Sequence, residues 1–324
     1  MFHRSSAAVR RILLTGVLLS IATYGTLNVF GGVVPVQHVV DFDGNGRTDF
    51  AVGRIVGTNQ LRWIYALNPS GATAALDWGL VLDEYVPEDY DGDGKTDVAV
   101  WRPGAPGVAA FYILNSQTNT VRIEVFGQTD DDPRVVGDYN NDGRADVALF
   151  RDGLWLYKTS AGGPTIQVVW GVAGDFPAPG DYNGDGSNDF VIQRNGGSGQ
   201  GVFWIRFSGG GSNVVTFGLP NDLVVPGDYD GDAKTDIAVA RRVTGGPIQW
   251  YWLQSSNGVA RQANWGLTAT DRPVQGDYDG DGKTDIAIWR SSGVFWVFNS
   301  ATSTSLAYSF GTAGDYPIAN FNVH

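Results

Sequence analysis

The chain has 324 residues, of which 43% are hydrophobic, and its 45 glycines and 14 prolines suit one large domain with many tight turns. The formal net charge is −12, and the sequence contains no basic cluster of the kind that binds nucleic acid. The lack of cysteine excludes disulfides, thiolate metal sites and a cysteine nucleophile, so we expect packing and bound metal to stabilise the fold.

Residues 1–22 have the features of a secretory signal peptide. Arg4, Arg10 and Arg11 precede an apolar run over residues 12–22, and the small residues Ser20 and Ala22 fit a cleavage site after Ala22. An uncleaved membrane anchor is the alternative, but the dense apolar core is shorter than the ~20 residues that a membrane span needs. We therefore expect a signal peptide at 1–22, a linker at 23–31 and a single secreted or extracytoplasmic domain at 32–324, with no membrane span after cleavage.

The rest of the chain is periodic. An aromatic–glycine pair recurs every 44–48 residues, at positions 30, 78, 126, 170, 217, 265 and 310, and such a period is typical of propellers and solenoids. Each unit contains four short strand patterns, for example residues 272–276, 285–290, 294–298 and a fourth that ends in the aromatic–glycine pair. The sequence therefore predicts an all-β propeller of six four-stranded blades, each of about 47 residues. We expect the third-strand aromatics to fill the space between blades; they are Trp63, Trp155, Trp204, Trp252 and Trp296.

Each unit also contains an aspartate-rich loop of nine residues between its first and second strands. In the stretch 277–285, carboxylates occupy positions 1, 3, 5 and 9, and glycines at positions 4 and 6 allow the backbone to turn inward. Carboxylates at alternate positions, with the backbone carbonyl of position 7, are the ligands that Ca²⁺ prefers. The sequence therefore predicts up to six Ca²⁺ sites. The candidate ligands at positions 1, 3, 5, 7 and 9 are Asp41, Asp43, Asn45, Arg47 and Asp49; Asp89, Asp91, Asp93, Lys95 and Asp97; Asp138, Asn140, Asp142, Arg144 and Asp146; Asp181, Asn183, Asp185, Ser187 and Asp189; Asp228, Asp230, Asp232, Lys234 and Asp236; and Asp277, Asp279, Asp281, Lys283 and Asp285.

An EF-hand does not fit these loops. It requires a bidentate glutamate at position 12 and flanking helices, whereas position 12 is Val100 or Ile288, inside β-branched and aromatic strand patterns. The six loops hold 21 of the 34 acidic residues, so the negative charge indicates metal sites rather than a surface for a basic partner. We expect weaker binding where Asn45, Asn140 or Asn183 replaces a carboxylate and where Ala233 replaces a glycine.

The stretch from Trp170 to Gly186, WGVAGDFPAPGDYNGDG, resembles the FG-GAP/VCBS-type repeat of bacterial secreted proteins. This repeat is related to the calcium-bearing propellers of integrin α-subunits and of some fungal lectins. The resemblance covers residues 32–324, and it implies a propeller whose loop acids bind Ca²⁺. It does not specify a ligand, because the family includes adhesins, lectins and accessory modules of enzymes.

A second pattern indicates how the ring closes. An arginine follows the last loop residue by five positions in all six units, and an aspartate precedes the first loop residue by six in five of them. Because the first and second strands are antiparallel neighbours, we expect a bidentate ion pair at the end of each hairpin opposite the loop. The first unit has Pro35 in place of this aspartate, so we expect residues 315–322 to complete the first blade. Seven blades are the alternative, but they would leave strands unpaired. The expected pairs are Arg54 with Asp315, Arg102 with Asp83, Arg151 with Asp132, Arg194 with Asp175, Arg241 with Asp222, and Arg290 with Asp271.

Catalysis has little support in the sequence. The three histidines, His3, His38 and His324, are scattered, and no nucleophile elbow or zinc-protease motif is present. We therefore expect a non-enzymatic adhesion or recognition module for an extracellular protein or glycan. It would bind through the more variable stretches 102–110, 127–133, 194–201 and 241–248, on the face opposite the loops. The alternatives are a structural or accessory propeller of a larger extracellular assembly, and a carbohydrate-active enzyme that uses acids outside the loops, such as Glu84 and Glu88.

Overall fold

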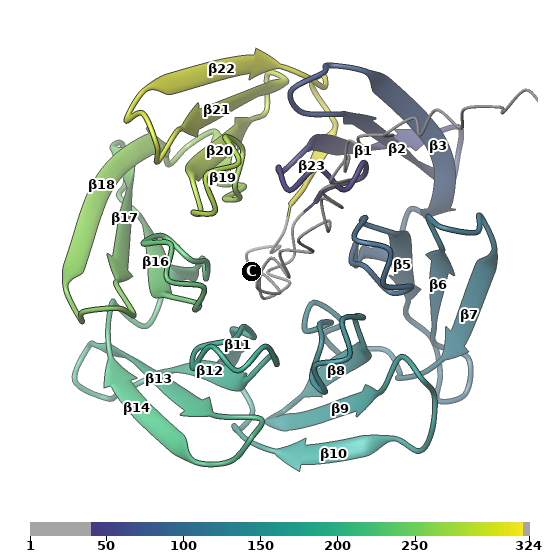
Figure 1. The fold of residues 1–324 in the computed structure, drawn as a ribbon, viewed down its shortest axis with the longest axis horizontal. Helices are drawn as coiled ribbons and strands as arrows, with labels where there is room; N and C mark the ends of the chain where they lie inside the picture. The colour runs from purple at the N-terminus through teal and green to yellow at the C-terminus, as the bar shows by residue number, and fades with distance from the viewer. Residues whose placement is uncertain (1–39, 320–324) are drawn as a thin grey trace, which may run out of the picture. The chain divides into compact units, whose positions relative to one another are not determined.

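The computed structural model describes residues 40–319, and these form six antiparallel sheets arranged as the blades of a ring (Figure 1). The prediction of a six-bladed all-β propeller is confirmed, and the described residues contain no helix. The signal peptide, the linker and the three histidines lie outside the described residues.

In each blade the strands lie side by side in order from the centre of the ring to its rim. Blade 1 contains β23 (Tyr316–Ile318), β1 (Phe50–Val56), β2 (Gln60–Ala66) and β3 (Thr73–Leu80), and blade 2 contains β4 (Glu84–Tyr85), β5 (Val98–Arg102), β6 (Ala110–Leu114) and β7 (Val121–Val125). Blade 3 contains β8 (Val147–Arg151), β9 (Leu154–Lys158) and β10 (Ile166–Val169), and blade 4 contains β11 (Phe176–Pro177), β12 (Phe190–Asn195), β13 (Gly201–Arg206) and β14 (Ser212–Thr216). Blade 5 contains β15 (Leu223–Val224), β16 (Ile237–Arg242), β17 (Pro247–Leu253) and β18 (Ala260–Leu267), and blade 6 contains β19 (Asp271–Pro273), β20 (Ile286–Arg290), β21 (Val294–Phe298) and β22 (Ser305–Ser309).

The ring closes as the sequence predicts. Strand β23, from the C-terminal end of the described chain, pairs antiparallel with β1, with Ala51 opposite Ile318 and Gly53 opposite Tyr316. The first blade is therefore built from both ends of the described chain. The alternative count of seven blades is wrong.

Blade 3 departs from the four-strand pattern at its centre. Its innermost strand is reduced to a single antiparallel bridge between Asp132 and Phe150. The aspartate of its turn, Asp131, lies seven positions before the loop rather than six as in blades 2, 4, 5 and 6, and the inner segment pairs with β8 only at that bridge. The displacement also changes an ion pair, described below.

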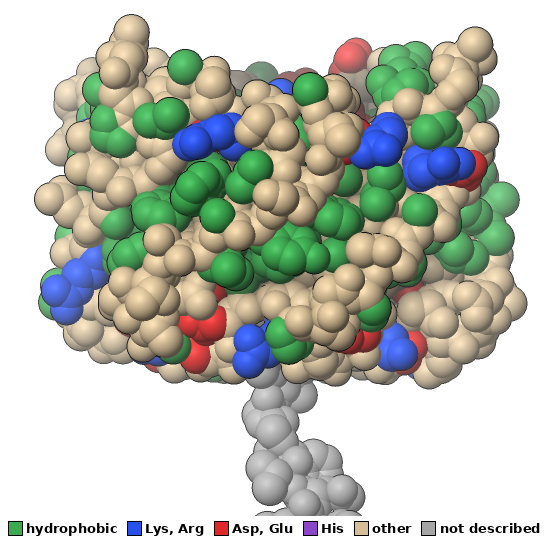
Figure 2. Space-filling view, turned by 90° about the horizontal axis from the view of Figure 1, so that it is seen from above, with side chains coloured by type: hydrophobic (Ala, Val, Ile, Leu, Met, Phe, Trp, Pro, Cys, Tyr) green, Lys and Arg blue, Asp and Glu red, His purple; other side chains and the backbone are tan. Residues whose placement is uncertain are grey.

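Burial decreases from the centre of each blade to its rim. The second strand is buried on both faces, as in β5, whereas the third strand alternates and the fourth is mostly exposed, as in β21 and β22. Blades stack face to face, so both faces of a second strand meet a neighbour, and the small residues Ala99 and Ala287 are fully buried there. Six apolar clusters result, one at each interface between blades. At the rim, Figure 2 shows a band of hydrophobic side chains with charged groups towards both edges.

The third-strand aromatics follow the prediction only in part. Trp63 and Trp155 are fully buried between blades, but Trp204 is 36% exposed. In β17 the buried position belongs to Trp250 rather than Trp252. Strand pairing explains the difference, because Trp63, Trp155 and Trp250 lie opposite the fourth residue of the second strand, whereas Trp204 lies opposite the third.

Candidate metal centres

The first aspartate of each nine-residue loop organises the backbone around itself. In loop 6, the Asp277 carboxylate accepts backbone N–H groups from Gly280 at 2.6 Å and Gly282 at 2.9 Å. In all six loops the position 1 carboxylate accepts the N–H groups of positions 5 and 6. This turn requires positive φ at position 6, and Ala233 adopts it at 65° despite its Cβ, at a cost of roughly 1–2 kcal/mol.

The aspartate at position 9 is the most buried group of each loop. The Asp285 carboxylate is fully buried, and its two oxygens accept the N–H groups of Tyr278 at position 2 and of Ser300 in the connection between the third and fourth strands. The same two bonds occur in every loop. Position 9 thus fastens the loop to the neighbouring connection and places a carboxylate beside position 1.

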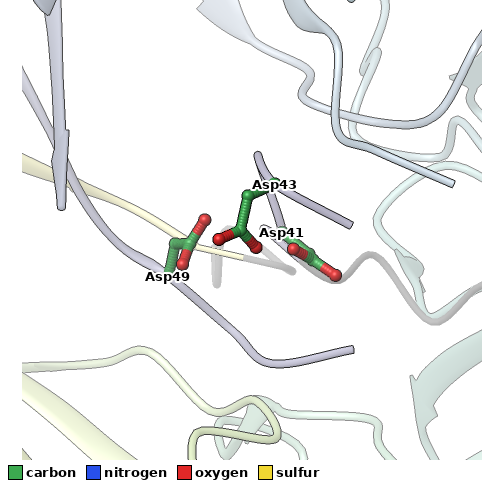
Figure 3. A group of neighbouring side chains, drawn as sticks. All are labelled: Asp41, Asp43 and Asp49. Atoms are coloured by element: carbon green, nitrogen blue, oxygen red, sulfur yellow. The ribbon is translucent and has the colours of Figure 1, made fainter. Parts of the chain in front are cut away.

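Position 3 divides the loops into two classes. Four loops have aspartate there, and in each of them the carboxylates of positions 1, 3 and 9 place oxygens within 4.8 Å of one another. In Figure 3 the Asp43 carboxylate lies between those of Asp41 and Asp49. In these same four loops one oxygen of the position 3 carboxylate is buried without a hydrogen-bond partner; these are the Oδ1 atoms of Asp43, Asp91, Asp230 and Asp279.

The other two loops have asparagine at position 3, and their amides are satisfied within the loop. The Asn140 amide donates to Asp142 at 3.1 Å, and the Asn183 amide donates to Asp185 at 2.9 Å. Each asparagine carbonyl also accepts the N–H of position 5. No orphaned oxygen remains at position 3 of these loops, which are loops 3 and 4.

The structure does not bring position 5 into the carboxylate groups. The Asp281 carboxylate at this position accepts the N–H of Lys283 at 2.9 Å and the hydroxyl of Ser300 at 3.0 Å. Asn45 likewise accepts the N–H of Arg47 at 2.9 Å. An asparagine at position 5 therefore leaves the group of loop 1 intact. The ligand roles of position 5 and of the position 7 carbonyl stay predictions.

The carboxylate groups fit one hard cation. Oxygens on opposite sides of an ion at 2.3–2.6 Å lie at most about 5 Å apart, and the oxygens of each group lie close enough together, within 4.8 Å, to contact one such ion. Burial raises the pKa of Asp49 to about 7 against the hydrogen bonds from Asn68 and Phe42, and the nearby Asp41 and Asp43 raise it further. Burial likewise raises the pKa of Asp97 to about 6. A divalent cation would relieve both the desolvation and the repulsion of these carboxylates.

Neighbouring loops are joined around the ring by backbone hydrogen bonds. In every loop the position 8 N–H donates to the position 1 carbonyl of the preceding loop, and the junction between the last and first loops is Thr48 to Asp277 at 2.6 Å. That junction has an additional clasp, because the buried Asn68 amide donates to the carbonyls of Thr48 at 3.0 Å and Tyr278 at 2.6 Å. The candidate cation loops of adjacent blades are therefore connected directly by backbone hydrogen bonds.

The opposite end of each inner hairpin carries an arginine–aspartate pair. Arg290 reaches both oxygens of Asp271 at 2.8 Å, and the pairs expected for Arg54, Arg102, Arg194 and Arg241 are also present. Burial would raise the pKa of Asp271, but the hydrogen bond from Arg290 and other bonds lower it overall. Each pair also joins the turn between blades to the second strand.

The pair predicted for Asp132 is wrong. Arg151 binds the fully buried Asp131 at 2.5 and 2.8 Å, whereas Asp132 binds Arg134 at 2.9 Å. The reason is that blade 3 has one extra residue between this aspartate and its loop. Counting six residues back from the first loop residue, Asp138, therefore gives Asp132 instead of Asp131. Counted forward from its aromatic–glycine pair, Asp131 is in register, and it accepts the Gln128 N–H as its equivalents accept theirs.

Comparison with known proteins supports these repeats. The family model described as "FG-GAP-like repeat" matches residues 89–149 and 228–288, and each match begins at the first aspartate of a loop. The chain is a β-propeller that contains FG-GAP-like repeats. No curated protein matches the sequence. Among solved structures, a chain titled "Crystal structure of the tricorn protease" is similar at 13% identity with a TM-score of 0.30; the match covers 79% of this chain and 25% of that chain. Within residues 40–319 of this FG-GAP propeller, no helix is long and apolar enough to cross a membrane.

Proposed function

We propose that this FG-GAP propeller is an extracellular recognition module whose ring is stabilised by Ca²⁺. The observation that carries the proposal is the buried, unpartnered carboxylate oxygen at position 3 of four loops, beside two further carboxylates. An all-oxygen, carboxylate-rich donor set favours Ca²⁺ over softer metals. Positions 1, 3 and 9 of loops 1, 2, 5 and 6 would hold the ion, which supplies positive charge and no chemistry of reaction.

The cation would act on stability through the hairpins that it fastens. Position 9 binds each loop, which joins the first and second strands, to the connection between the third and fourth strands, so a filled loop would hold all four strands of its blade together. Binding to the folded state alone contributes about 2.7 kcal/mol per site at a concentration of 100 times the dissociation constant. Four sites would thus account for a large share of the stability of the ring.

Recognition would use the face opposite the loops, which carries the connections between second and third strands and between blades. Large apolar side chains are exposed on these connections, including Leu82 at 77%, Val108 at 65% and Val172 at 50%. The innermost strands add Phe176 and Tyr316, which are 43% and 36% exposed near the centre of this face. Exposed apolar groups in a polar rim are typical of surfaces that bind proteins or glycans.

Calcium binding is tested by native mass spectrometry and calorimetry on the full chain, with thermal unfolding in Ca²⁺ and in excess chelator. We expect four bound ions and a melting temperature that falls by at least 10 °C in chelator. Replacing Asp43, Asp91, Asp230 and Asp279 together by asparagine, the residue that loops 3 and 4 already contain, should abolish both effects. An unchanged melting temperature in chelator would refute the stabilising role.

The ligand is sought with a glycan array and with pull-down from extracellular material, each with and without chelator. Leu82→Asp combined with Val108→Asp should abolish capture, whereas Val259→Asp, a 43% exposed position on the loop face, should not. Capture by a glycan would make the module lectin-like, and capture of one protein would make it an adhesin. A folded sample that captures neither would leave a structural role in an assembly.

A further inference from the structure

The outermost strand of blade 2, β7, is exposed in an unusual way. Its sequence is Val121-Arg122-Ile123-Glu124-Val125, and the three aliphatic residues are 53%, 56% and 50% exposed. The charged residues point to the other face, where the side chains of Arg122 and Glu124 are 25% and 27% exposed. The usual order of a rim strand is therefore reversed, with β-branched side chains facing solvent and charges half-buried.

No other outer strand has this pattern among the described residues. Strands β14 and β22 each expose one large aliphatic residue, Val214 or Leu306, and β10 exposes two that are three residues apart. Strands β3 and β18 contain register irregularities, whereas β7 pairs regularly with β6 along its whole length. Natural edge strands usually avoid association by bulges, proline or charged side chains. Strand β7 has no bulge and no proline, and its two charged side chains, Arg122 and Glu124, lie on the face opposite its exposed aliphatic residues.

The free edge of β7 offers the backbone groups of its aliphatic residues. Phe126, just after β7, donates its N–H at 2.8 Å to the carbonyl of Ala109, just before β6, so residues of even number direct their backbone towards β6. Because backbone direction alternates along a strand, residues 121, 123 and 125 direct theirs outwards. The amine of Lys158 lies 3.4 Å from the Val125 carbonyl, which agrees with this direction and leaves one lone pair of that oxygen available.

The strand is self-complementary when a second copy pairs with it antiparallel about Ile123. In that register Ile123 lies opposite its own equivalent and Val121 lies opposite Val125. Arg122 lies opposite Glu124 of the other copy, so a positive charge faces a negative charge on each side of the two-fold axis. The three outward-directed residues become hydrogen-bonded pairs, which gives six backbone hydrogen bonds between the copies. Aliphatic and opposite-charge neighbours both stabilise antiparallel pairs.

We propose that β7 is a self-association edge through which two copies of this propeller form a two-fold symmetric dimer by continuing the blade 2 sheet. Such an interface is isologous, as in most homodimers. A five-residue strand buries less than the ~800 Å² per partner of a standard interface, so the dimer should form in the micromolar range or above. The proposal does not depend on cation binding or on the recognition face.

Sedimentation velocity of the full chain in Ca²⁺, from about 1 to 300 µM, tests the proposal. We expect a concentration-dependent shift from monomer to dimer for the native chain. Ile123→Lys should remain monomeric throughout the range, whereas Val214→Lys, the same change on the outer strand of blade 4, should dimerise as the native chain does. A native chain that stays monomeric at 300 µM, or equal loss of dimer in both variants, would overturn the proposal.

Charge reversal tests the register. Arg122→Glu alone and Glu124→Arg alone place like charges opposite each other, so each variant should be monomeric. An equimolar mixture of the two should form a heterodimer, because every charged pair is then complementary. Circular dichroism and melting temperature establish that each variant is folded, since Glu124 also binds Lys158 at 2.6 Å. A mixture that stays monomeric while the native chain dimerises would refute this register and, with it, the two-fold pairing about Ile123.

Discussion

The ion pair of blade 3 gives a sharp test of the fold, because two adjacent aspartates compete for one arginine in the sequence. We predict that Asp131→Ala strongly destabilises the propeller and that Asp132→Ala does not. The Asp131 carboxylate is fully buried, accepts two bonds from Arg151 and also accepts the Gln128 N–H at 2.9 Å. Its removal leaves a guanidinium and a backbone N–H without their partner.

The expected cost follows from burial. Breaking a fully buried ion pair costs about 3–5 kcal/mol, but the Arg151 side chain is 33% exposed, so water can replace part of the interaction. We therefore expect a loss of about 2–3 kcal/mol for Asp131→Ala. Asp132 has 16% of its side chain exposed and binds Arg134, which is 27% exposed. The Asp132 carboxylate is more accessible than that of Asp131 and its partner is only two residues away, so we expect its loss to cost about 0.5–1 kcal/mol.

Equilibrium urea unfolding in saturating Ca²⁺, followed by tryptophan fluorescence and far-UV circular dichroism, measures both values. The two variants differ by one position and remove the same charge, so net charge and unfolded-state effects largely cancel between them. A loss for Asp132→Ala that equals or exceeds that for Asp131→Ala would contradict the assignment of the pair.

Three further predictions concern the loops and the blade interfaces. Asn140→Asp should raise the number of bound Ca²⁺ ions from four to five and Asp279→Asn should lower it to three, as counted by native mass spectrometry. Because burial raises the pKa of Asp49 to about 7, Ca²⁺ affinity should fall between pH 8 and 6 with proton release, measured by calorimetry in two buffers. In the cation-free protein this raised pKa stabilises the folded state at low pH, and the stabilisation is lost as the pH rises through 7. Urea unfolding at a series of pH values measures this change. Trp78→Phe should cost about 1 kcal/mol in urea unfolding by removing the 3.1 Å bond from its indole to the Tyr112 carbonyl of the next blade.

The period of the sequence was sufficient to predict the propeller, because each repeat carries its own turn, strand and burial signals. It also predicted the closure, since Arg54 lacked an aspartate in its own repeat and Asp315 supplies one. The partner of Arg151 was missed because counting from the loop assumes that no residue is inserted between loop and turn. Counting from Gly127 would have identified Asp131, since both ends of that turn are fixed by hydrogen bonds.

The candidate ligands were also only partly predictable. Spacing shows which side chains can approach one point, but not which oxygens the backbone has already used. At position 5, Oδ1 of Asp93 accepts both the N–H of Lys95 and the hydroxyl of Ser116, and the carboxylate lies outside the group formed by positions 1, 3 and 9. Position 3 determines whether a loop is prepared to bind a cation, because an aspartate there retains a buried oxygen without a hydrogen-bond partner and an asparagine does not. Sequence alone weighted the two positions equally, and they are separated by the folded loop, which brings position 3 and not position 5 beside positions 1 and 9.

The 47-residue repeat also contains a longer periodicity of two blades. The aromatic–glycine pair contains tryptophan in blades 1, 3 and 5 and phenylalanine in blades 2, 4 and 6. Each of these tryptophans, of which Trp170 is an example, donates to a third-strand carbonyl of the next blade. The phenylalanines have no donor for such a bond. The ring therefore consists of three pairs of blades, and this pairing follows from indole hydrogen bonding rather than from the 47-residue repeat.

The four loops with a complete carboxylate group are consecutive around the ring, in the order 5, 6, 1 and 2. They span the junction between blade 6 and blade 1, the blade in which β23 and β1 come from opposite ends of the described chain and meet through strand pairing. Asn68 adds its amide clasp at this junction. Loops 3 and 4 lie on the far side, in blades whose strands are consecutive in the chain. The proposed cation sites are thus concentrated around blade 1, whose inner strand is held by pairing alone, and we expect chelation to open the ring there before it affects blades 3 and 4.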